Sequence, residues 1–384
     1  MPVVKSLRIK PGKLHGAEIN AGLAGTVMRF IPPIAAIAAG RTILDGDLQA
    51  RKRPMAATIS SLRQLGVEVR AGGIGGDTLP IQILGQGFVD GGEIEIDAAK
   101  SSQFVSALLL VGACFNRGVT LRHRGDRLPS LPHIEMTISV LRECGVQVTA
   151  EYSADGATWQ VSPGIIQLPE ITVESDLSNA GPFLAAAMIT GGQIKIPNWP
   201  RQTTQAGNEF VRIFTAQGAQ TAYRHDGGVL TLRGPEEIFP LDLDCHAIGE
   251  LVPTLAAVCA FAGGPSVLRD IGQLRGHETD RLTALVCELE KVGVGACIVG
   301  DDLFITPPAE KISGYKAAKL SSYADHRMAA FGAILGLRIP GVEVENIETT
   351  SKTMPNFVEL WEKMIAESQA VSVASATEIS QAGV

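Results

Sequence analysis

The chain of 384 residues is long enough for two or three domains, and its 45% hydrophobic and 19% charged residues allow a large core and exclude a wholly disordered chain. The formal net charge of −7 argues against bulk nucleic-acid binding, although a basic pocket for a small anion can lie within an acidic protein. The longest uncharged stretches contain glycine and proline, which indicates buried helices and turns rather than membrane spans. No apolar signal region is visible at the N-terminus, so we expect a cytoplasmic protein whose six cysteines are free thiols.

In chain order, two kinds of predicted helix alternate. The first kind is apolar on every face, which is typical of buried helices, and is expected at residues 26–39, 101–113, 178–190, 248–262 and 325–337. The second kind is amphipathic, with proline or glycine signals at several ends, and is expected at residues 54–65, 132–144, 204–217, 279–292 and 355–367. Short strands are predicted between these helices at residues 42–44, 93–96, 119–122, 193–196, 267–269 and 342–344.

Four of the amphipathic helices end in an internal repeat. The pattern Leu-x-x-x-Gly-Val-x-Val occurs at residues 62–69 and 141–148, with weaker copies at 214–221 and 289–296. This spacing of roughly 75 residues indicates pseudo-symmetric domains built from a few βα units. Five helix pairs cannot be shared equally between two lobes, which is the first indication that a unit is missing.

The first turns of the apolar helices carry polar residues. Ordinary N-capping explains Asp176 and Ser178. It does not explain Arg29 and Arg327, because the positive end of a helix dipole disfavours a cation unless an anion lies nearby. A further cluster at residues 275–281 combines two arginines, a histidine and two acids, and it is either a capping box with surface charges or an acid/base group beside phosphate-binding arginines.

Several familiar cofactor motifs are missing from the sequence. The glycines at residues 72–76 lie between two predicted strands and indicate a hairpin turn rather than a dinucleotide-binding loop. The seven histidines have no metal-ligand spacing. We therefore expect chemistry that uses neither a metal nor a nucleotide cofactor.

Eight segments, in order along the chain, resemble the 5-enolpyruvylshikimate-3-phosphate (EPSP) synthase family. They are residues 24–29, 53–55, 101–103, 129–133, 176–187, 277–282, 325–328 and 351–353. The resemblance implies an α/β, two-lobed enolpyruvyl transferase fold of repeated βαβαββ units, an inside-out α/β barrel with five of six units present. It implies a first lobe at 1–172, a second lobe at 173–367 and a disordered tail at 368–384.

The resemblance also implies the reaction and its substrates. The enolpyruvyl group of phosphoenolpyruvate would be transferred to the 5-hydroxyl of shikimate 3-phosphate with release of phosphate, a step of aromatic amino-acid biosynthesis. The implied partners are these two small anions, with no nucleic acid, membrane, metal or cofactor, and the family default is a monomer.

Site residues follow from the same resemblance. Shikimate 3-phosphate is expected at Ser101, Ser102, Gln103, Ser130, His133, Glu250, Gln273 and His277. Phosphoenolpyruvate is expected at Gly25, Arg53, Gln103, Arg281, Arg327 and Lys352. The expected catalytic residues are Glu250, Glu278 and His277, and the expected supporting residues are Thr26, Arg29, Asp176 and Asp325.

The chain departs from the family pattern in two important ways. His277 stands where most of the family has lysine, and because histidine titrates near neutrality we expect a rate that is sensitive to pH between 6 and 8. No counterpart of the family's first Pro-Gly-Ser-Lys-Ser segment is present, so we expect an N-terminally truncated chain. An impaired or inactive remnant of the enzyme, and the related UDP-N-acetylglucosamine enolpyruvyl transferase, are the alternatives.

Overall fold

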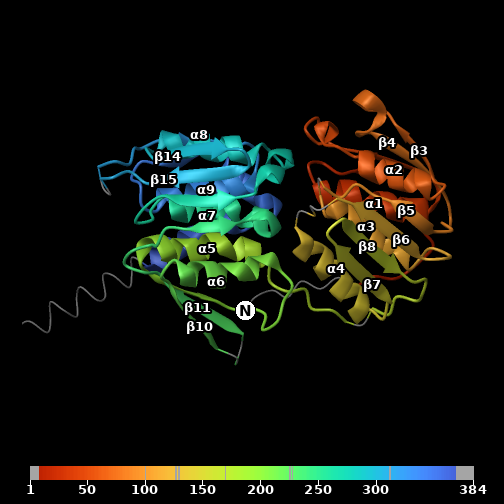
Figure 1. The fold of residues 1–384 in the computed structure, drawn as a ribbon, viewed down its shortest axis with the longest axis horizontal. Helices are drawn as coiled ribbons and strands as arrows, with labels where there is room; N and C mark the ends of the chain where they lie inside the picture. Colours follow the sequence, from red (N-terminus) through yellow and green to blue (C-terminus); the bar gives the residue numbers. More distant parts are fainter. Residues whose placement is uncertain are drawn as a thin grey trace, which may run out of the picture. The chain divides into compact units, whose positions relative to one another are not determined.

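The computed structural model describes residues 8–368, except for residues 100, 126, 127, 129, 169, 225, 227, 311 and 312. The predicted tail beyond residue 368 lies outside the described residues. The chain divides into two compact units between Ile171 and Thr172, where the sequence predicted a boundary between 172 and 173. We call these units the first and second lobes (Figure 1). Among the described helices, none has the length and apolar character needed to cross a membrane.

The first lobe contains two successive copies of one βαβαββ unit. The first copy consists of β1 (Glu18–Asn20), α1 (Gly25–Ala36), β2 (Ala39–Asp45), α2 (Ala56–Gln64), β3 (Glu68–Ala71) and β4 (Ile81–Gln86). The second consists of β5 (Gly92–Glu95), α3 (Gln103–Gly112), β6 (Val119–Arg124), α4 (Leu131–Glu143), β7 (Val148–Ser153) and β8 (Gly156–Val161). The strand orders, β1-β2-β4-β3 and β5-β6-β8-β7, are equivalent. In each sheet the first pair is parallel and the other two are antiparallel.

The second lobe contains a third complete copy between two partial ones. It begins with α5 (Leu177–Thr190), β9 (Gln193–Ile196), α6 (Glu209–Ala216), β10 (Gln220–Arg224) and β11 (Val229–Arg233). The complete copy follows as β12 (Asp242–Asp244), α7 (Val252–Cys259), β13 (Ser266–Arg269), α8 (Arg281–Lys291), β14 (Gly295–Val299) and β15 (Asp302–Thr306). The last elements are β16 (Lys319–Leu320), α9 (His326–Gly336), β17 (Glu343–Val344) and a helix at residues 357–368.

The predicted α/β fold of repeated units is confirmed, and each predicted helix has a counterpart. The largest difference lies in the helix predicted at 248–262. A 3₁₀ segment, η4 (His246–Leu251), occupies its start, and the α-helix begins only at Val252. Pro253 lies in the first turn of α7, where its missing N–H is not needed for a helical hydrogen bond.

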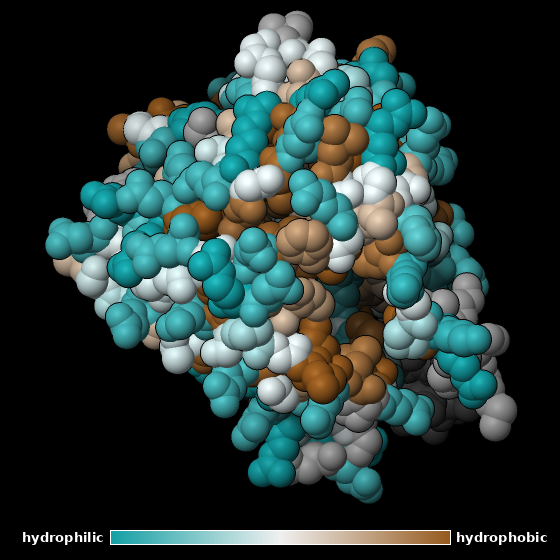
Figure 2. Space-filling model, turned by 90° about the vertical axis from the view of Figure 1, so that its right-hand side faces the viewer, coloured by the Kyte–Doolittle hydropathy of each residue, from teal (hydrophilic) through white to brown (hydrophobic). Residues whose placement is uncertain are grey.

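The apolar helices form the centre of each lobe. In the second lobe α5, α7 and α9 pack against one another, and every residue of α7 is buried. In the first lobe α1 packs against α3. Some apolar side chains also reach the surface, as the brown areas of Figure 2 show for the face that it draws. In each lobe the sheets flank these central helices. The polar first turns of the helices carry the residues predicted to bind substrate.

Candidate active site

In the first lobe, the first turns of α1 and α3 meet through Arg29. The Nη1 of Arg29 donates a hydrogen bond of 2.6 Å to Oε1 of Gln103. The guanidinium also lies over the ring of Phe104, 5.2 Å from its centroid, and Arg29 is only 5% exposed. The cation is thus held by the start of the neighbouring helix α3, and the anion expected near Arg29 stays a prediction.

Arg53 lies against Gly25 at the start of α1. Its Nη1 donates to the carbonyl oxygen of Leu23 at 3.3 Å. A Cβ atom on Gly25 would lie 2.7 Å from Nη1 and 2.8 Å from Nη2 of Arg53, which is too close for any real contact. Glycine at position 25 therefore provides the space in which the Arg53 guanidinium lies.

The predicted serines of the first lobe organise two other helix starts. The Oγ of Ser101 accepts a hydrogen bond from the amide of Gln103 at 3.3 Å, and Ser102 is buried beside it. Ser130 adopts a left-handed conformation with φ of 55° at the start of α4, and its carbonyl accepts from the amide of His133 at 3.0 Å. Thr26 is exposed in the first turn of α1.

In the second lobe, a buried arginine contacts three other predicted site residues. Arg281 is 2% exposed, and its Nε and Nη2 donate to the two carboxylate oxygens of Asp325 at 2.7 and 3.1 Å. Nη2 also donates to Glu278 at 3.0 Å, and Nη1 lies 2.8 Å from Nδ1 of His277. Asp325 in turn caps α9 by accepting from the amide of Arg327 at 2.9 Å. This bidentate ion pair ties the start of α8 to the start of α9.

Glu278 lies between two cations. Lys352 donates to its Oε1 at 2.7 Å while Arg281 bonds its Oε2. Burial alone would raise the pKa of Glu278, but Arg281 and Lys352 hold that pKa well below its usual range. The same balance of burial against Arg281 lowers the pKa of Asp325. Both carboxyl groups are therefore ionised at neutral pH.

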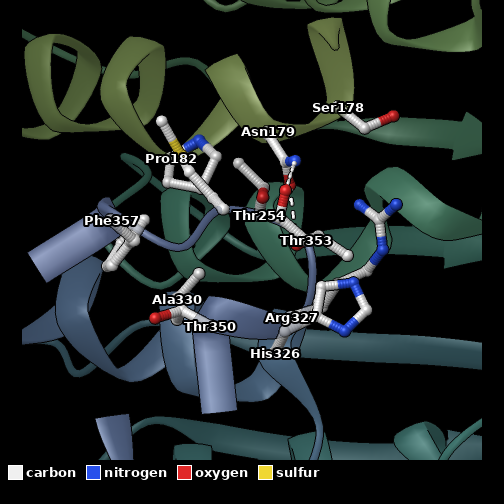
Figure 3. A pocket seen from close by; sticks show the side chains of 11 residues that line it. Ser178, Asn179, Pro182, Thr254, His326, Arg327, Ala330, Thr350, Thr353 and Phe357 are labelled. Atoms are coloured by element: carbon white, nitrogen blue, oxygen red, sulfur yellow. Dashed lines mark hydrogen bonds between the residues drawn. The ribbon is translucent and has the colours of Figure 1, made fainter. Parts of the chain in front are cut away.

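Arg327 is a further cation beside this cluster. It lies with His326 and Asn179 in a pocket between the starts of α5 and α9, and Figure 3 shows its guanidinium directed toward Ser178. Within the part of the chain that the structure describes, its guanidinium makes no hydrogen bond or ion pair. Burial and the neighbouring Arg281 lower the pKa of Arg327. A partly buried cation without a bonded anion is costly, and a bound anion would relieve that cost.

Three further predicted residues lie in the second lobe. Glu250, on η4, is 7% exposed and interacts electrostatically with Arg281 and Arg327. Gln273 donates from Nε2 to the carbonyl of His246 at 3.0 Å, which fixes η4 against the following segment. Asp176 caps α5 by accepting from the amide of Asn179 at 3.0 Å.

Sequence reasoning named Asn179 and Thr353 only as members of matching segments. The Nδ2 of Asn179 donates to the carbonyl of Thr353 at 3.2 Å, and the Thr353 hydroxyl donates to Oδ1 of Asn179 at 3.2 Å (Figure 3). These bonds hold the residue after Lys352 against the start of α5. No spacing rule could have paired two residues so far apart in the chain.

The expectation that His277 titrates near neutrality is wrong. Burial and the adjacent Arg281 lower the pKa of His277 to about 3. His326, buried beside Arg327, has its pKa lowered to about 4. Both imidazoles are neutral between pH 6 and 8, so neither gives the rate a pH dependence in that range by its own titration.

The lowered pKa values of these two histidines lead to a prediction of how the stability of the protein changes with pH. In the unfolded chain a histidine accepts a proton below about pH 6.5, whereas the folded chain keeps both rings neutral. The unfolded state then binds more protons, and the free energy of unfolding falls as the pH drops from about 6.5 to 5, by about 1–2 kcal/mol for each histidine. Urea unfolding across this range should be less pH-dependent in His277→Gln/His326→Gln. The exposed His15→Gln is the control, and a wild-type slope near zero would contradict the expectation.

Comparisons with known proteins show to which family the chain belongs. The sequence pattern of the family described as EPSP synthase (3-phosphoshikimate 1-carboxyvinyltransferase) matches residues 4–361. Because the match starts at residue 4, it does not support the expectation of a truncated chain. The 3-phosphoshikimate 1-carboxyvinyltransferase of Kocuria rhizophila is 48% identical over 370 residues, which are 95% of this chain and 80% of that protein.

Solved structures show the same fold. An EPSP synthase from Acinetobacter baumannii superposes with a TM-score of 0.72 at 23% identity, covering 92% of this chain and 79% of the other. The enolpyruvyl transferase NikO from Streptomyces tendae gives a TM-score of 0.62 at 18% identity, covering 86% and 74%. With the family pattern and the 48% identical relative, these findings lead to one conclusion: the chain belongs to the EPSP synthase family of transferases.

Proposed function

We propose that this chain transfers the enolpyruvyl group of phosphoenolpyruvate to the 5-hydroxyl of shikimate 3-phosphate and releases phosphate. Family membership supports the reaction class. The single observation that carries the proposal is the Arg327 guanidinium, partly buried beside the Arg281–Glu278–Lys352 cluster and without a bonded anion among the described residues. Such a site favours a small, highly charged anion.

The cluster also suggests how phosphoenolpyruvate would be received. Lys352 is 27% exposed at its side chain and, among the described residues, bonds only Glu278, so it can turn to an incoming phosphate or carboxylate. Arg281 would keep its bidentate bond to Asp325 and stay fixed, which costs no reorganisation during the reaction. When Lys352 leaves Glu278, the pKa of Glu278 rises, and its carboxyl group becomes a better proton donor.

That change matches the chemistry of the transfer. The 5-hydroxyl oxygen bonds to C2 of phosphoenolpyruvate while C3 gains a proton, and loss of phosphate with loss of that C3 proton restores the double bond. We assign the C3 proton to Glu278, which would take up a proton once Lys352 has turned to the bound substrate, give it to C3, and accept a C3 proton back as phosphate leaves. We assign removal of the hydroxyl proton to Glu250, which is 7% exposed near both arginines. His277, neutral and beside Arg281, would accept or donate a hydrogen bond to the reacting hydroxyl rather than carry charge.

We assign the first-lobe residues to both substrates. Ser101, Ser102, Gln103, Ser130 and His133, with Gln273 from the second lobe, would bind shikimate 3-phosphate. Gly25 and Arg53 would contact phosphoenolpyruvate together with Gln103, and Arg29 and Thr26 would support them. The bond from Arg29 to Gln103 and the space that Gly25 leaves for Arg53 support these roles.

Gly25→Ala provides a test of the Arg53 assignment. The new methyl group must displace the end of the Arg53 side chain, which is flexible, so the fold should survive. We expect KM for phosphoenolpyruvate to rise about 10-fold with a smaller change for shikimate 3-phosphate, because one charged hydrogen bond contributes about 1.5–3 kcal/mol. Steady-state kinetics with each substrate varied in turn would measure this, and Gly12→Ala, whose new methyl group meets nothing within 4 Å, is the control for a glycine substitution without a close contact. Equal KM values for wild type and Gly25→Ala would contradict the assignment.

The proposal as a whole is tested by phosphate release from the purified 384-residue chain. We expect release only when both phosphoenolpyruvate and shikimate 3-phosphate are present. Release without shikimate 3-phosphate would indicate a phosphatase, and no release with both would favour an inactive relative. Replacing shikimate 3-phosphate by UDP-N-acetylglucosamine tests the alternative activity, that of UDP-N-acetylglucosamine enolpyruvyl transferase. We expect no phosphate release with this acceptor. We also propose that the chain is a monomer and acts in the cytoplasm. Light scattering of the purified chain would measure its oligomeric state.

A further inference from the structure

A fully buried carboxylate lies outside the site residues described above. Glu288, on α8, has a side chain that is 0% exposed. Its Oε1 accepts from the Tyr323 hydroxyl at 2.6 Å, and its Oε2 accepts from the amide of Ser321 at 3.1 Å. Lys291 bonds both oxygens at 2.8 Å. Buried charges are rarely kept unless their bonds are satisfied, and here three donor groups make four hydrogen bonds to the carboxylate.

Two of these donors belong to a strained segment. Tyr323 and Ala324 are consecutive residues in the left-handed region, with φ of 55° and 54°. Each such residue other than glycine costs about 1–3 kcal/mol and persists only where its surroundings hold it. We call residues 321–325 the 321–325 turn. It leads directly into Asp325 and Arg327 at the start of α9.

Helix α8 holds the 321–325 turn at both ends. Arg281, at the start of the helix, bonds Asp325 at one end of the turn. Glu288, two helical turns later, bonds Ser321 and Tyr323 at the other. Burial and the Glu288 carboxylate raise the pKa of Tyr323, which agrees with a phenol that keeps its proton to donate this bond. The position of Arg327 therefore depends on two carboxylate contacts, one made by Asp325 with Arg281 and one made by Glu288 with the turn.

We infer that Glu288 is a positioning residue for the reaction: it holds the 321–325 turn in its left-handed conformation and so sets where Asp325 and Arg327 stand. It touches no substrate and acts through the turn. The consequence for catalysis rests on the proposed function, because Arg327 is assigned there to phosphoenolpyruvate.

The test compares Glu288→Gln with Glu290→Gln, an exposed glutamate on the same helix. Glutamine keeps the shape but replaces one acceptor oxygen with a donor, so it cannot accept from both Ser321 and Tyr323. We expect hydrogen exchange at the amides of residues 321–327 to become at least about tenfold faster in Glu288→Gln only, with the rest of the second lobe unchanged. We expect kcat/KM for phosphoenolpyruvate to fall about 10- to 100-fold, mainly through KM.

A rescue separates positioning from general destabilisation. Ala324→Gly lets the backbone adopt positive φ without strain, so adding it to Glu288→Gln should restore part of kcat/KM and slow the exchange again. Exchange that is equal in Glu288→Gln and Glu290→Gln, exchange that rises uniformly across the lobe, or the absence of rescue would each overturn the inference. If Glu288→Gln does not fold, Tyr323→Phe removes one of the bonds alone, and unchanged exchange at the turn in that variant would overturn it. If the wild type releases no phosphate, the proposed function fails while hydrogen exchange still decides the role of Glu288.

Discussion

Replacing Arg281 with methionine is expected to lower the free energy of unfolding by about 3–5 kcal/mol and to abolish turnover. The substitution leaves Asp325, which is 0% exposed, and Glu278 without their shared cation. Removing one partner of a buried ion pair is far more costly than removing both, because the remaining charge stays desolvated. The cap of α9 is weakened at the same time, since Asp325 is held in place by Arg281.

The matched control is Arg275→Met. Arg275 also pairs with an aspartate, Asp301, but the two side chains are 40% and 47% exposed. Exposed pairs contribute about 0–1 kcal/mol, so this variant should unfold close to wild type. Urea unfolding of the three proteins side by side measures the difference. A loss in Arg281→Met no larger than in Arg275→Met would show that the buried pair does not hold α8 and α9 together.

Replacing Arg327 with glutamine should change activity and stability in opposite directions. The guanidinium makes no hydrogen bond or ion pair with the described residues, and burial together with Arg281 lowers its pKa. Removing it therefore relieves a cost of folding, and we expect stability equal to or above that of wild type. If this cation binds the transferred substrate, kcat/KM for phosphoenolpyruvate should fall about 10²- to 10³-fold, the effect of losing one fixed charged donor.

Arg233→Gln, which removes an exposed arginine on β11, is the control for general effects of lost charge. This variant should leave both the stability and the kcat/KM for phosphoenolpyruvate unchanged. Thermal unfolding with and without inorganic phosphate adds a second readout, because phosphate should stabilise wild type more than Arg327→Gln. A variant that is less stable and fully active would mean that Arg327 serves the fold rather than the substrate.

The repeat and the helix pattern could be predicted from the sequence because burial dictates them. A helix that is apolar on all sides, such as residues 252–259, is stable only when it is buried at the centre of a lobe. The glycine after each of the four repeat-bearing amphipathic helices adopts positive φ, at Gly66, Gly145, Gly218 and Gly293, which explains why the repeat was visible there. The polar first turns were visible because capping residues are local signals.

The organisation of the site could not be predicted, because its contacts join residues distant in sequence. Arg281 and Asp325 are 44 residues apart, and Asn179 and Thr353 are 174 apart. The pKa of His277 depends on its burial beside Arg281, which no residue type reveals, and this is why the expected titration near neutrality was wrong. Glu288 looked like one charge among several on a surface helix, and only the fold shows its side chain turned inward onto Ser321 and Tyr323.

The most direct test of the whole account is the identity of the product. The purified chain would be incubated with phosphoenolpyruvate and shikimate 3-phosphate, and the mixture analysed by mass spectrometry and proton NMR. We predict a new compound, shikimate 3-phosphate with an enolpyruvyl ether at the 5-oxygen, formed together with one phosphate for each molecule. Unchanged substrates, or phosphate and pyruvate without the ether, would contradict it.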